Sequence, residues 1–239
     1  MIDGAAEPAA PAGGWHEATV AEVEHHTPHG VRLRLDIADR ETHVPGQHYV
    51  VRLVAPDGYV AQRSYSVASA PSDPLVELYV ERLDEGEVSV FLADVVVVGD
   101  VLKVRGPIGG WFVWRGSEPM LGVAGGSGVV PLVSMSRHAR SVGADDLVRL
   151  AVSGRTLRQL PYADELRAAG AAVALTREPA PWGRPQGRLM PDELAPLVEG
   201  RDRYFVCGSQ LFAEGMSDLL VMLGAPVDRI RVERFGPSG

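Results

Sequence analysis

The hydrophobic pattern changes its period near residues 116–119, and this change constrains the fold more than any other feature of the 239-residue sequence. Before it, short β-branched runs alternate apolar and polar residues, as half-buried strands do. After it, apolar runs alternate with longer segments of helical periodicity, which is typical of a parallel sheet with crossover helices. The sequence therefore predicts two domains, residues 15–115 and 116–239, behind a flexible tail at residues 1–14.

Six strands are expected in the first half, because turns rich in Pro, Gly and Asp separate the strand-like runs. One short helix at residues 89–94, with Ser89 as its N-cap, interrupts them. Short antiparallel strands at this spacing predict a barrel or sandwich. The expected strands are residues 18–23, 31–37, 49–54, 64–68, 76–82 and 101–105.

The second half repeats a strand followed by a helix, which predicts a doubly wound parallel sheet. The expected strands are residues 120–124, 147–153, 172–176, 204–207 and 230–232. The expected helices are residues 131–142, 162–169, 192–198 and 211–223. The predicted fold class is therefore a six-stranded antiparallel β-barrel followed by an α/β domain.

The composition disfavours several classes of protein. Lys and Arg number 23 against 31 Asp and Glu, and the net charge of -8 disfavours a protein that binds duplex nucleic acid. Cys207 is the only cysteine, which excludes an internal disulfide, a Cys-based structural zinc site and a four-Cys iron–sulfur cluster within this chain. The histidines show no metal-binding spacing such as HExxH. Any metal redox centre is therefore expected in another protein.

The sequence also predicts a cytoplasmic protein. Its first 14 residues contain no Lys or Arg and no apolar core, unlike a secretory signal. The longest apolar run, around residues 95–98, is far shorter than the roughly 18 residues that a membrane span needs. No membrane partner is expected.

A glycine-rich turn, GGSGVVP at residues 125–131, connects the first strand of the second half to a helix. Glycines let the backbone approach a phosphate closely, and the free N–H groups at a helix start attract a pyrophosphate. The turn therefore indicates a dinucleotide site. A turn of this kind is also the tightest way to leave a parallel sheet, and the full GxGxxG spacing is missing, so a purely structural role stays open.

The segment RSYS at residues 63–66 lies in an expected strand of the first half. Strand alternation puts Arg63 and Tyr65 on one face and Ser64 and Ser66 on the other. A cation and an aromatic ring on one face suit a ligand that has both a phosphate and a ring, although a solvated strand with Arg packed over Tyr has the same pattern. Downstream, residues 86–89 offer a second helix start for an anion.

The order of several short motifs is more informative than any one of them. They are Pro45-Gly46-Gln47, Arg63-Ser64-Tyr65-Ser66, Gly86-x-x-Ser89, Gly106-Pro107-x-Gly109, the turn at residues 125–131, Cys207-Gly208 and Glu233-x-Phe235. In this order they resemble the motifs of the ferredoxin-NADP reductase family, including the reductase modules of bacterial oxygenases. The resemblance covers residues 15–235 and implies a flavin-binding barrel, a nicotinamide-nucleotide domain and hydride transfer between them.

The resemblance also implies roles for residues of the barrel. Arg63 would contact the flavin pyrophosphate, Tyr65 would pack against the isoalloxazine ring, and Ser66 would form a hydrogen bond near flavin N5. Ser64 belongs to the same cofactor-binding strand. The helix start would hold the pyrophosphate through Gly86, Val88 and Ser89.

In the second domain, the resemblance implies that the glycine-rich turn receives the nicotinamide dinucleotide through Gly125, Gly126, Gly128 and Pro131. Cys207 and Gly208 would lie beside the nicotinamide, and Glu233 matches the acidic residue of the hydride-transfer cleft. Phe235 matches the C-terminal aromatic that covers the flavin. The chain departs from the family in two places: Ser209 stands where Pro is common, and four residues follow Phe235.

The resemblance therefore implies an oxidoreductase that transfers hydride from NADPH or NADH to FAD and passes single electrons to a separate protein, such as a ferredoxin or an oxygenase component. NADPH is favoured, because Arg155 follows the second strand of the α/β domain and Thr176-Arg177 follows the third. Arginine recognises phosphate in a bidentate manner, and Thr176-Arg177 resembles the Ser-Arg pair that NADP-dependent relatives place on the 2′-phosphate. These residues can also be ordinary surface arginines.

Two other functions remain open. A non-catalytic subunit could keep the two-domain fold to bind nucleotide or flavin, although pure binding requires none of Ser66, Cys207 and Glu233. A free-flavin reductase would hold flavin as a substrate, although the expected pyrophosphate contacts favour tightly bound FAD.

Overall fold

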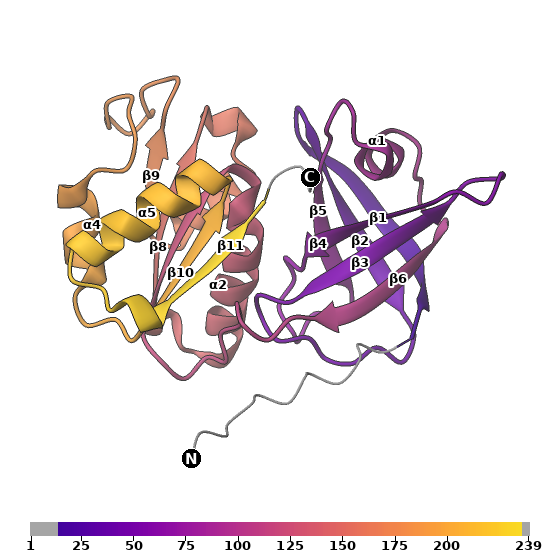
Figure 1. Ribbon diagram of the computed structural model, residues 1–239, viewed down its shortest axis with the longest axis horizontal. Coiled ribbons are helices and arrows are strands. Elements are labelled where there is room, and N and C mark those ends of the chain that lie inside the picture. Colours follow the sequence, from indigo (N-terminus) through magenta and orange to yellow (C-terminus); the bar gives the residue numbers. More distant parts are fainter. Residues whose placement is uncertain (1–13, 236–239) are drawn as a thin grey trace, which may run out of the picture.

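The computed structural model describes residues 14–235, so the expected tail lies outside the described residues except for Gly14. Two bodies lie side by side, one built around a parallel sheet and the other around an antiparallel sheet (Figure 1). The C-terminal strand of the parallel sheet leads back towards the antiparallel one. The carboxyl end of this strand therefore lies on the side of its body that faces the antiparallel sheet.

The first sheet has six strands in the order β4-β3-β6-β1-β2-β5, and every pairing is antiparallel. Its strands are β1 (His16–Thr27), β2 (Gly30–Ile37), β3 (His48–Val54), β4 (Val60–Ser66), β5 (Val76–Glu81) and β6 (Val101–Ile108). Leu33, Leu78 and Leu92 lie fully buried inside it. The predicted six-stranded antiparallel architecture is confirmed, and in β2 and the first half of β6 buried residues alternate with more exposed ones.

The helix of the barrel, α1 (Glu87–Asp94), begins earlier than the sequence suggested. Its N-cap is Gly86, so the prediction that Ser89 is the N-cap was wrong. Ser89 is the third helical residue, where its hydroxyl donates to the Gly86 carbonyl at 3.0 Å and accepts from the Leu83 N–H at 3.1 Å. The hydroxyl thus stabilises the preceding turn from inside the helix.

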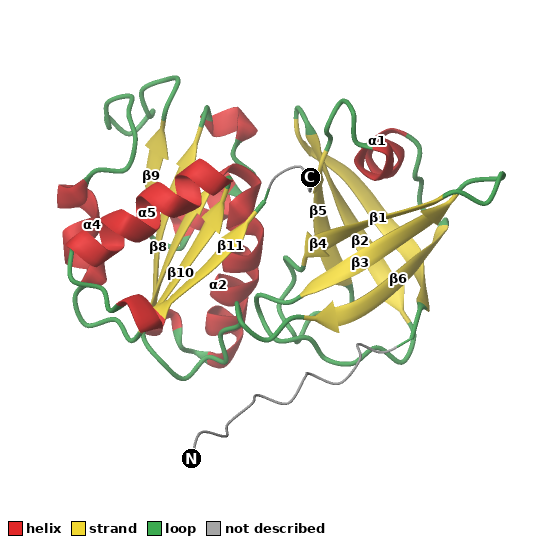
Figure 2. Cartoon of the chain, viewed as in Figure 1, coloured by secondary structure: helices red, strands yellow, loops and turns green. Residues whose placement is uncertain are grey.

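The second sheet is parallel throughout, with strand order β11-β10-β7-β8-β9. Its strands are β7 (Met120–Gly125), β8 (Val148–Gly154), β9 (Ala172–Leu175), β10 (Arg203–Gly208) and β11 (Ile230–Arg234). The helices are α2 (Val130–Val142), α3 (Ala163–Ala168), α4 (Pro191–Val198) and α5 (Gln210–Met222). Short 3₁₀ segments span Gly126–Val129, Asp145–Leu147, Leu157–Gln159 and Val227–Arg229. Helices cover both faces (Figure 2), as the predicted doubly wound arrangement requires.

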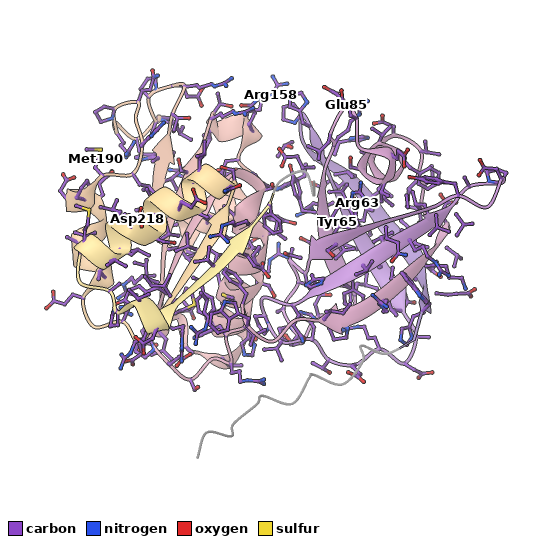
Figure 3. The ribbon with its side chains drawn as sticks, viewed as in Figure 1. Arg63, Tyr65, Glu85, Arg158, Met190 and Asp218 are labelled. Carbon is purple, nitrogen blue, oxygen red and sulfur yellow. The ribbon has the colours of Figure 1, made fainter. Side chains whose placement is uncertain are left out.

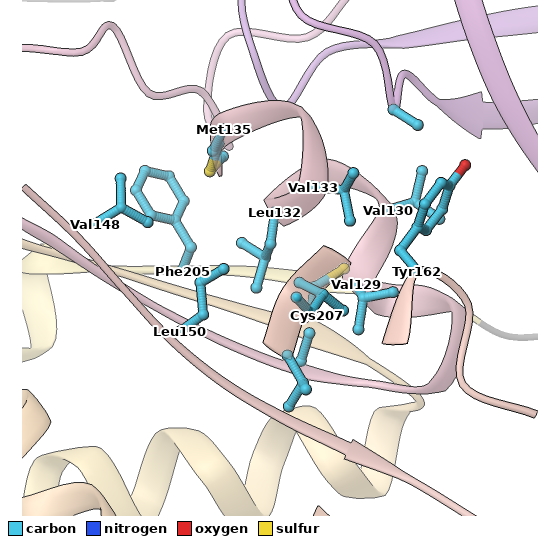
Figure 4. Packing of buried hydrophobic residues seen from close by; sticks show 14 of the residues in the cluster. Val129, Val130, Leu132, Val133, Met135, Val148, Leu150, Tyr162, Phe205 and Cys207 are labelled. Atoms are coloured by element: carbon cyan, nitrogen blue, oxygen red, sulfur yellow. The ribbon is translucent and has the colours of Figure 1, made fainter. Parts of the chain in front are cut away.

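Helix α2 lies between the parallel sheet and the barrel (Figure 1). On its sheet side, Leu132 and Met135 belong to a buried cluster with Leu150 and Phe205 (Figure 4). The same cluster includes Tyr79 and other buried residues from the first half of the chain, namely Ala68, Phe112 and Trp114. One apolar cluster therefore spans the junction of the two sheets, beside the separate core inside the barrel.

A buried polar network crosses the same junction. The Arg137 guanidinium of α2 donates to Glu77 of β5 at 3.0 Å and to Glu165 of α3 at 2.8 Å. The Tyr162 hydroxyl donates to the same Glu77 carboxylate at 2.8 Å. Since Glu77 is only 4% exposed, its charge depends on these partners rather than on water.

Removing Arg137 should destabilise the protein strongly. Arg137→Ala leaves the buried Glu77 carboxylate without its cationic partner, and breaking a buried pair in this way costs about 3–5 kcal/mol. Arg140→Ala is the matched control on the same helix, because Arg140 is exposed and lies 3.9 Å from Glu165, so about 1 kcal/mol or less is expected. Urea unfolding followed by circular dichroism measures both, and equal losses would show that the network does not hold the junction together.

Candidate active site

The predicted site residues of the second domain lie at the carboxyl ends of its strands. The glycine-rich turn follows β7, Cys207 and Gly208 end β10, and Glu233 lies near the end of β11. In a parallel sheet these ends share one edge, which is where such folds bind ligands. The barrel reaches this edge through Glu81 at the end of β5, whose carboxylate accepts a 2.6 Å hydrogen bond from Ser127 of the turn.

The glycines of the turn serve two different purposes. A Cβ on Gly128 would lie 2.5 Å from the Cys207 carbonyl oxygen, so this position packs directly on the end of β10. Gly125 lies against the Phe212 ring in the same way. Gly126 has a left-handed φ of +59° and open space where a Cβ would point. Packing therefore explains Gly128 and Gly125, whereas Gly126 leaves the backbone accessible to a ligand.

Helix α2 begins directly after this turn, with Pro131 in its first turn. Proline suits this position because the N–H that it lacks would have no helical partner there. The 3₁₀ segment Gly126–Val129 runs directly into this helix, and the Val130 N–H already donates to the Ser127 carbonyl. The start of the 3₁₀ segment, after Gly125, has no side-chain cap, so the N–H groups that can donate to an anion are those of the glycine-rich turn itself.

Cys207 and Glu233 occupy neighbouring positions on the adjacent strands β10 and β11. The Cys207 side chain is completely buried, and burial together with the nearby Glu233 charge raises the pKa of its thiol. The thiol therefore stays neutral and serves as a small apolar group rather than a nucleophile. The Phe235 N–H donates to the Gly208 carbonyl at 2.8 Å, which ties the end of β11 to the end of β10.

Burial raises the pKa of the Glu233 carboxyl to about 7. A carboxyl with this pKa is partly protonated at neutral pH, so it can either hold or release a proton. Phe235, two residues later, packs against the apolar cluster at the junction. Residues 236–239, which follow it, lie outside the described residues.

On the barrel side, exposure does not alternate along the predicted motif of β4, because Arg63 and Ser64 are both exposed and Ser66 is buried. Tyr65 pairs with the buried Tyr49 of β3 and packs on the barrel core, whereas Ser66 pairs with His48. The exposed Arg63 donates to the Gln62 carbonyl at 2.7 Å and forms no ion pair with an acidic side chain of residues 14–235. Figure 3 shows Arg63 and Tyr65 on the part of the barrel that borders the other domain.

The start of α1 offers backbone donors rather than side chains. Val88 is 1% exposed and belongs to the barrel core, so only its backbone can face a ligand. A Cβ on Gly86 would lie 2.4 Å from the Ser89 oxygen, so a larger residue here would displace the Ser89 hydroxyl. The first turn of α1 has no side-chain cap, and its N–H groups remain available to an anion.

The residues predicted to recognise a 2′-phosphate lie together. The Arg177 N–H donates to the Arg155 carbonyl at 2.8 Å, which joins the chain beyond β9 to the chain beyond β8. Both arginine side chains are exposed. The Thr176 hydroxyl donates to the Gly154 carbonyl at 3.2 Å. The two cations therefore flank one corner of the sheet edge.

The structure adds residues that the sequence analysis missed. Ser127 and Glu81 are 46 residues apart, and nothing local in the sequence indicates their contact. Glu77 was detectable in principle, because it is an acidic residue within the apolar run of β5. Among residues 14–235, no group of three or more potential ligands could hold a metal ion. The described helices also include none that is long and apolar enough to span a bilayer.

Residues 18–113 match the family model of the oxidoreductase FAD-binding domain. The ferredoxin–NAD(P)⁺ reductase component of the naphthalene 1,2-dioxygenase/salicylate 5-hydroxylase systems of a Ralstonia species is 29% identical, over 93% of this chain and 70% of the relative. The reductase component of propane 2-monooxygenase from Rhodococcus jostii is 28% identical, over 80% of this chain and 55% of the relative. The chain thus spans little more than half the length of some relatives.

Solved structures agree with this relationship. The cytochrome P450 reductase GcoB of Amycolatopsis has a TM-score of 0.79 at 25% identity, over 95% of this chain and 71% of that chain. A ferredoxin NADP⁺ reductase from Neisseria gonorrhoeae with bound FAD and NADP has the same fold, with a TM-score of 0.78 at 20% identity over 92% of this chain and 98% of that chain. Fold and sequence together define an FAD-binding oxidoreductase. Residues 18–113 thus match an oxidoreductase FAD-binding domain, and the chain is similar over most of its length to reductase components of oxygenase systems.

The raised pKa of Glu233 should make stability depend on pH. The folded state holds the carboxyl proton more tightly than the unfolded state, so this contribution is fully present below about pH 4.5 and is lost as the pH rises through about 7. The free energy of unfolding of the wild type should therefore fall relative to Glu233→Gln over this range. Urea unfolding at pH 4.5, 5.5, 6.5 and 7.5 gives the difference. A constant difference would show that the Glu233 pKa is not raised.

Proposed function

We propose that this protein takes a hydride from NADPH onto bound FAD and passes electrons one at a time to a separate redox protein, a ferredoxin or an oxygenase component. The proposal rests on two partial sites, one from each domain, which we call half-sites and which adjoin each other. The barrel contributes Arg63, Tyr65 and the start of α1, and the parallel sheet contributes the glycine-rich turn with Cys207 and Glu233. The Ser127–Glu81 hydrogen bond joins the two half-sites.

The residues of the barrel suit FAD. Arg63 has no acidic partner among the described residues, and the uncapped start of α1 lies in the same domain, so the barrel can offer a guanidinium and backbone N–H groups to a pyrophosphate. Tyr65 would pack against the flavin ring, and Ser66 would donate near N5. When bound, FAD supplies the chemistry that accepts a hydride and releases single electrons.

The α/β domain would hold the nicotinamide nucleotide. Gly126 and the uncapped start of the 3₁₀ segment that leads into α2 would bind the pyrophosphate through the backbone. Cys207, which is small, neutral and rigidly buried, would set the distance of the nicotinamide ring from the flavin. Phe235 would cover the reacting rings and exclude water.

Glu233 is the residue of this edge that can exchange a proton near neutral pH. Because burial raises its pKa to about 7, a small change in nearby charge would be enough to change its protonation state. We assign it the role of holding or releasing a proton as the charge beside it changes during turnover. Cys207, Ser66 and Glu233 are therefore the proposed catalytic residues.

The acceptor is proposed from the relatives, which are named as reductase components of oxygenase systems. The chain has one cysteine and cannot itself ligate a four-Cys iron–sulfur cluster. We therefore expect the acceptor centre outside these 239 residues. Since the proposed donor is NAD(P)H, a reductant of the cytoplasm, we place the protein there.

Visible absorption of the purified protein tests the proposal. The expected result is a yellow protein whose heat-released cofactor runs as FAD, whose absorbance bleaches with NADPH in the absence of oxygen, and which reduces a ferredoxin. A yellow protein that NADPH does not bleach would indicate a binding subunit instead. A colourless protein that turns over added flavin would indicate a free-flavin reductase. Either result would overturn the proposal.

Arg63→Ala tests the flavin half-site, and visible absorption of the purified variant measures how much FAD it retains. Loss of a charge-assisted contact of about 1.5–3 kcal/mol corresponds to roughly one to two decades in FAD affinity. Arg82→Ala is the matched control, because Arg82 also belongs to the barrel but is held by Asp84 and Asp94. Equal loss of flavin from both variants would exclude a specific role for Arg63.

Arg177→Ala should reduce the preference for NADPH. Loss of one phosphate contact worth about 1.4 kcal/mol lowers the NADPH/NADH ratio of kcat/KM about 10-fold. Arg229→Ala is the control, because Arg229 precedes β11 at the opposite edge of the sheet and pairs with Asp202. The ratio is measured by steady-state kinetics with each nucleotide. A wild-type preference for NADH, or an unchanged ratio, would show that Arg177 does not recognise the phosphate.

A further inference from the structure

One acidic side chain of the barrel reaches the nucleotide turn. Glu81 is the last residue of β5, an edge strand of the antiparallel sheet, and is exposed. Its carboxylate accepts a 2.6 Å hydrogen bond from the Ser127 hydroxyl, which lies between Gly126 and Gly128. The contact joins the two domains at the turn where, under the proposed function, the nucleotide pyrophosphate would bind.

The start of α2 makes this carboxylate electrostatically significant. Helix α2 is 13 residues long, has no acidic residue in its first turn and receives no side-chain cap. A helix start carries a partial positive charge that favours a nearby anion. Glu81 brings a full negative charge to the turn that leads into this helix, and it does so from the other domain.

The turn itself has little freedom to move away from Glu81. On one side, Gly128 lies against the Cys207 carbonyl, where a Cβ would approach within 2.5 Å. On the other side, Ser127 is held by Glu81. A pyrophosphate that approaches Gly126 would therefore arrive near a carboxylate of the same charge.

We propose that Glu81 sets the affinity for the nucleotide by competing with its pyrophosphate for the glycine-rich turn. The inference rests on the proposed function and deepens it. Without nucleotide, the carboxylate occupies the anion-attracting side of the turn through Ser127. When the nucleotide binds, Glu81 is displaced or repels the pyrophosphate, and this weakens the binding of oxidised and reduced nucleotide alike.

Glu81→Gln tests the role of charge with little change of shape. The amide oxygen can still accept from Ser127, so the turn keeps its contact while the negative charge is removed. Glu85→Gln is the matched control, because Glu85 is an exposed acid of the same domain that forms no hydrogen bond or ion pair within residues 14–235 (Figure 3). Titration calorimetry of the flavin-loaded proteins with NADP⁺ and with NAD⁺ measures the dissociation constants.

For Glu81→Gln, both dissociation constants should fall by about three- to tenfold, and binding should depend more steeply on salt because a repulsive charge is gone. KM should fall while the rate constant of flavin reduction at saturating NADPH stays the same. Glu85→Gln should change none of these values. Affinity that is unchanged or weaker in Glu81→Gln, or an equal gain in Glu85→Gln, would overturn the inference.

Measurements on the wild type distinguish a failure of the Glu81 role from a failure of the proposed function. If it binds NADP⁺ or NAD⁺ and NADPH bleaches its flavin, but Glu81→Gln behaves like the wild type, only the role of Glu81 is wrong. If the wild type binds neither nucleotide, the proposed function fails, and the role of Glu81 fails with it.

Discussion

The buried carboxylate of Glu77 is the constraint on which the arrangement of the two sheets depends. It lies on β5 of the barrel, and its partners Arg137 and Tyr162 come from the α/β domain. A carboxylate that is almost completely buried is stable only where such partners surround it, so the network specifies one orientation of the two domains. The apolar contacts of the cluster at the junction stabilise the association of the two domains, and the polar network fixes their relative orientation.

Under the proposed function, this relative orientation of the domains determines how the nicotinamide and flavin rings face each other for hydride transfer. Hydride transfer requires reacting atoms about 3–3.5 Å apart, and small displacements are costly in rate. Glu77 and Glu81 lie on the same face of β5, on either side of Tyr79, and they contact α2 and the turn before it. One strand of the barrel therefore aligns both the helix and the nucleotide turn of the other domain.

Much of the architecture could be predicted because its signals are local. β7 was expected at residues 120–124 and is observed over Met120–Gly125, since its apolar run is bounded by clear turn residues. The strand β4 itself was expected at residues 64–68 and is observed over Val60–Ser66. The start of α1 was predicted wrongly, because Ser89 has the composition of an N-cap and its use inside the helix depends on the shape of the preceding turn. Contacts such as Ser127 with Glu81 depend on how two independent sheets dock, and no local pattern records this.

The apolar cluster that spans the junction limits how this protein can be divided. Phe112 of the first half packs edge-to-face on Phe205 of β10, with ring centroids 5.1 Å apart, and Trp114 is fully enclosed between the two halves. Cutting the chain at the change of sequence pattern would expose these rings on both pieces, and exposed apolar patches promote aggregation. For protein engineering, the transplantable unit is therefore the pair of domains, and a chimaera that replaces only one must bring a matching aromatic surface with it.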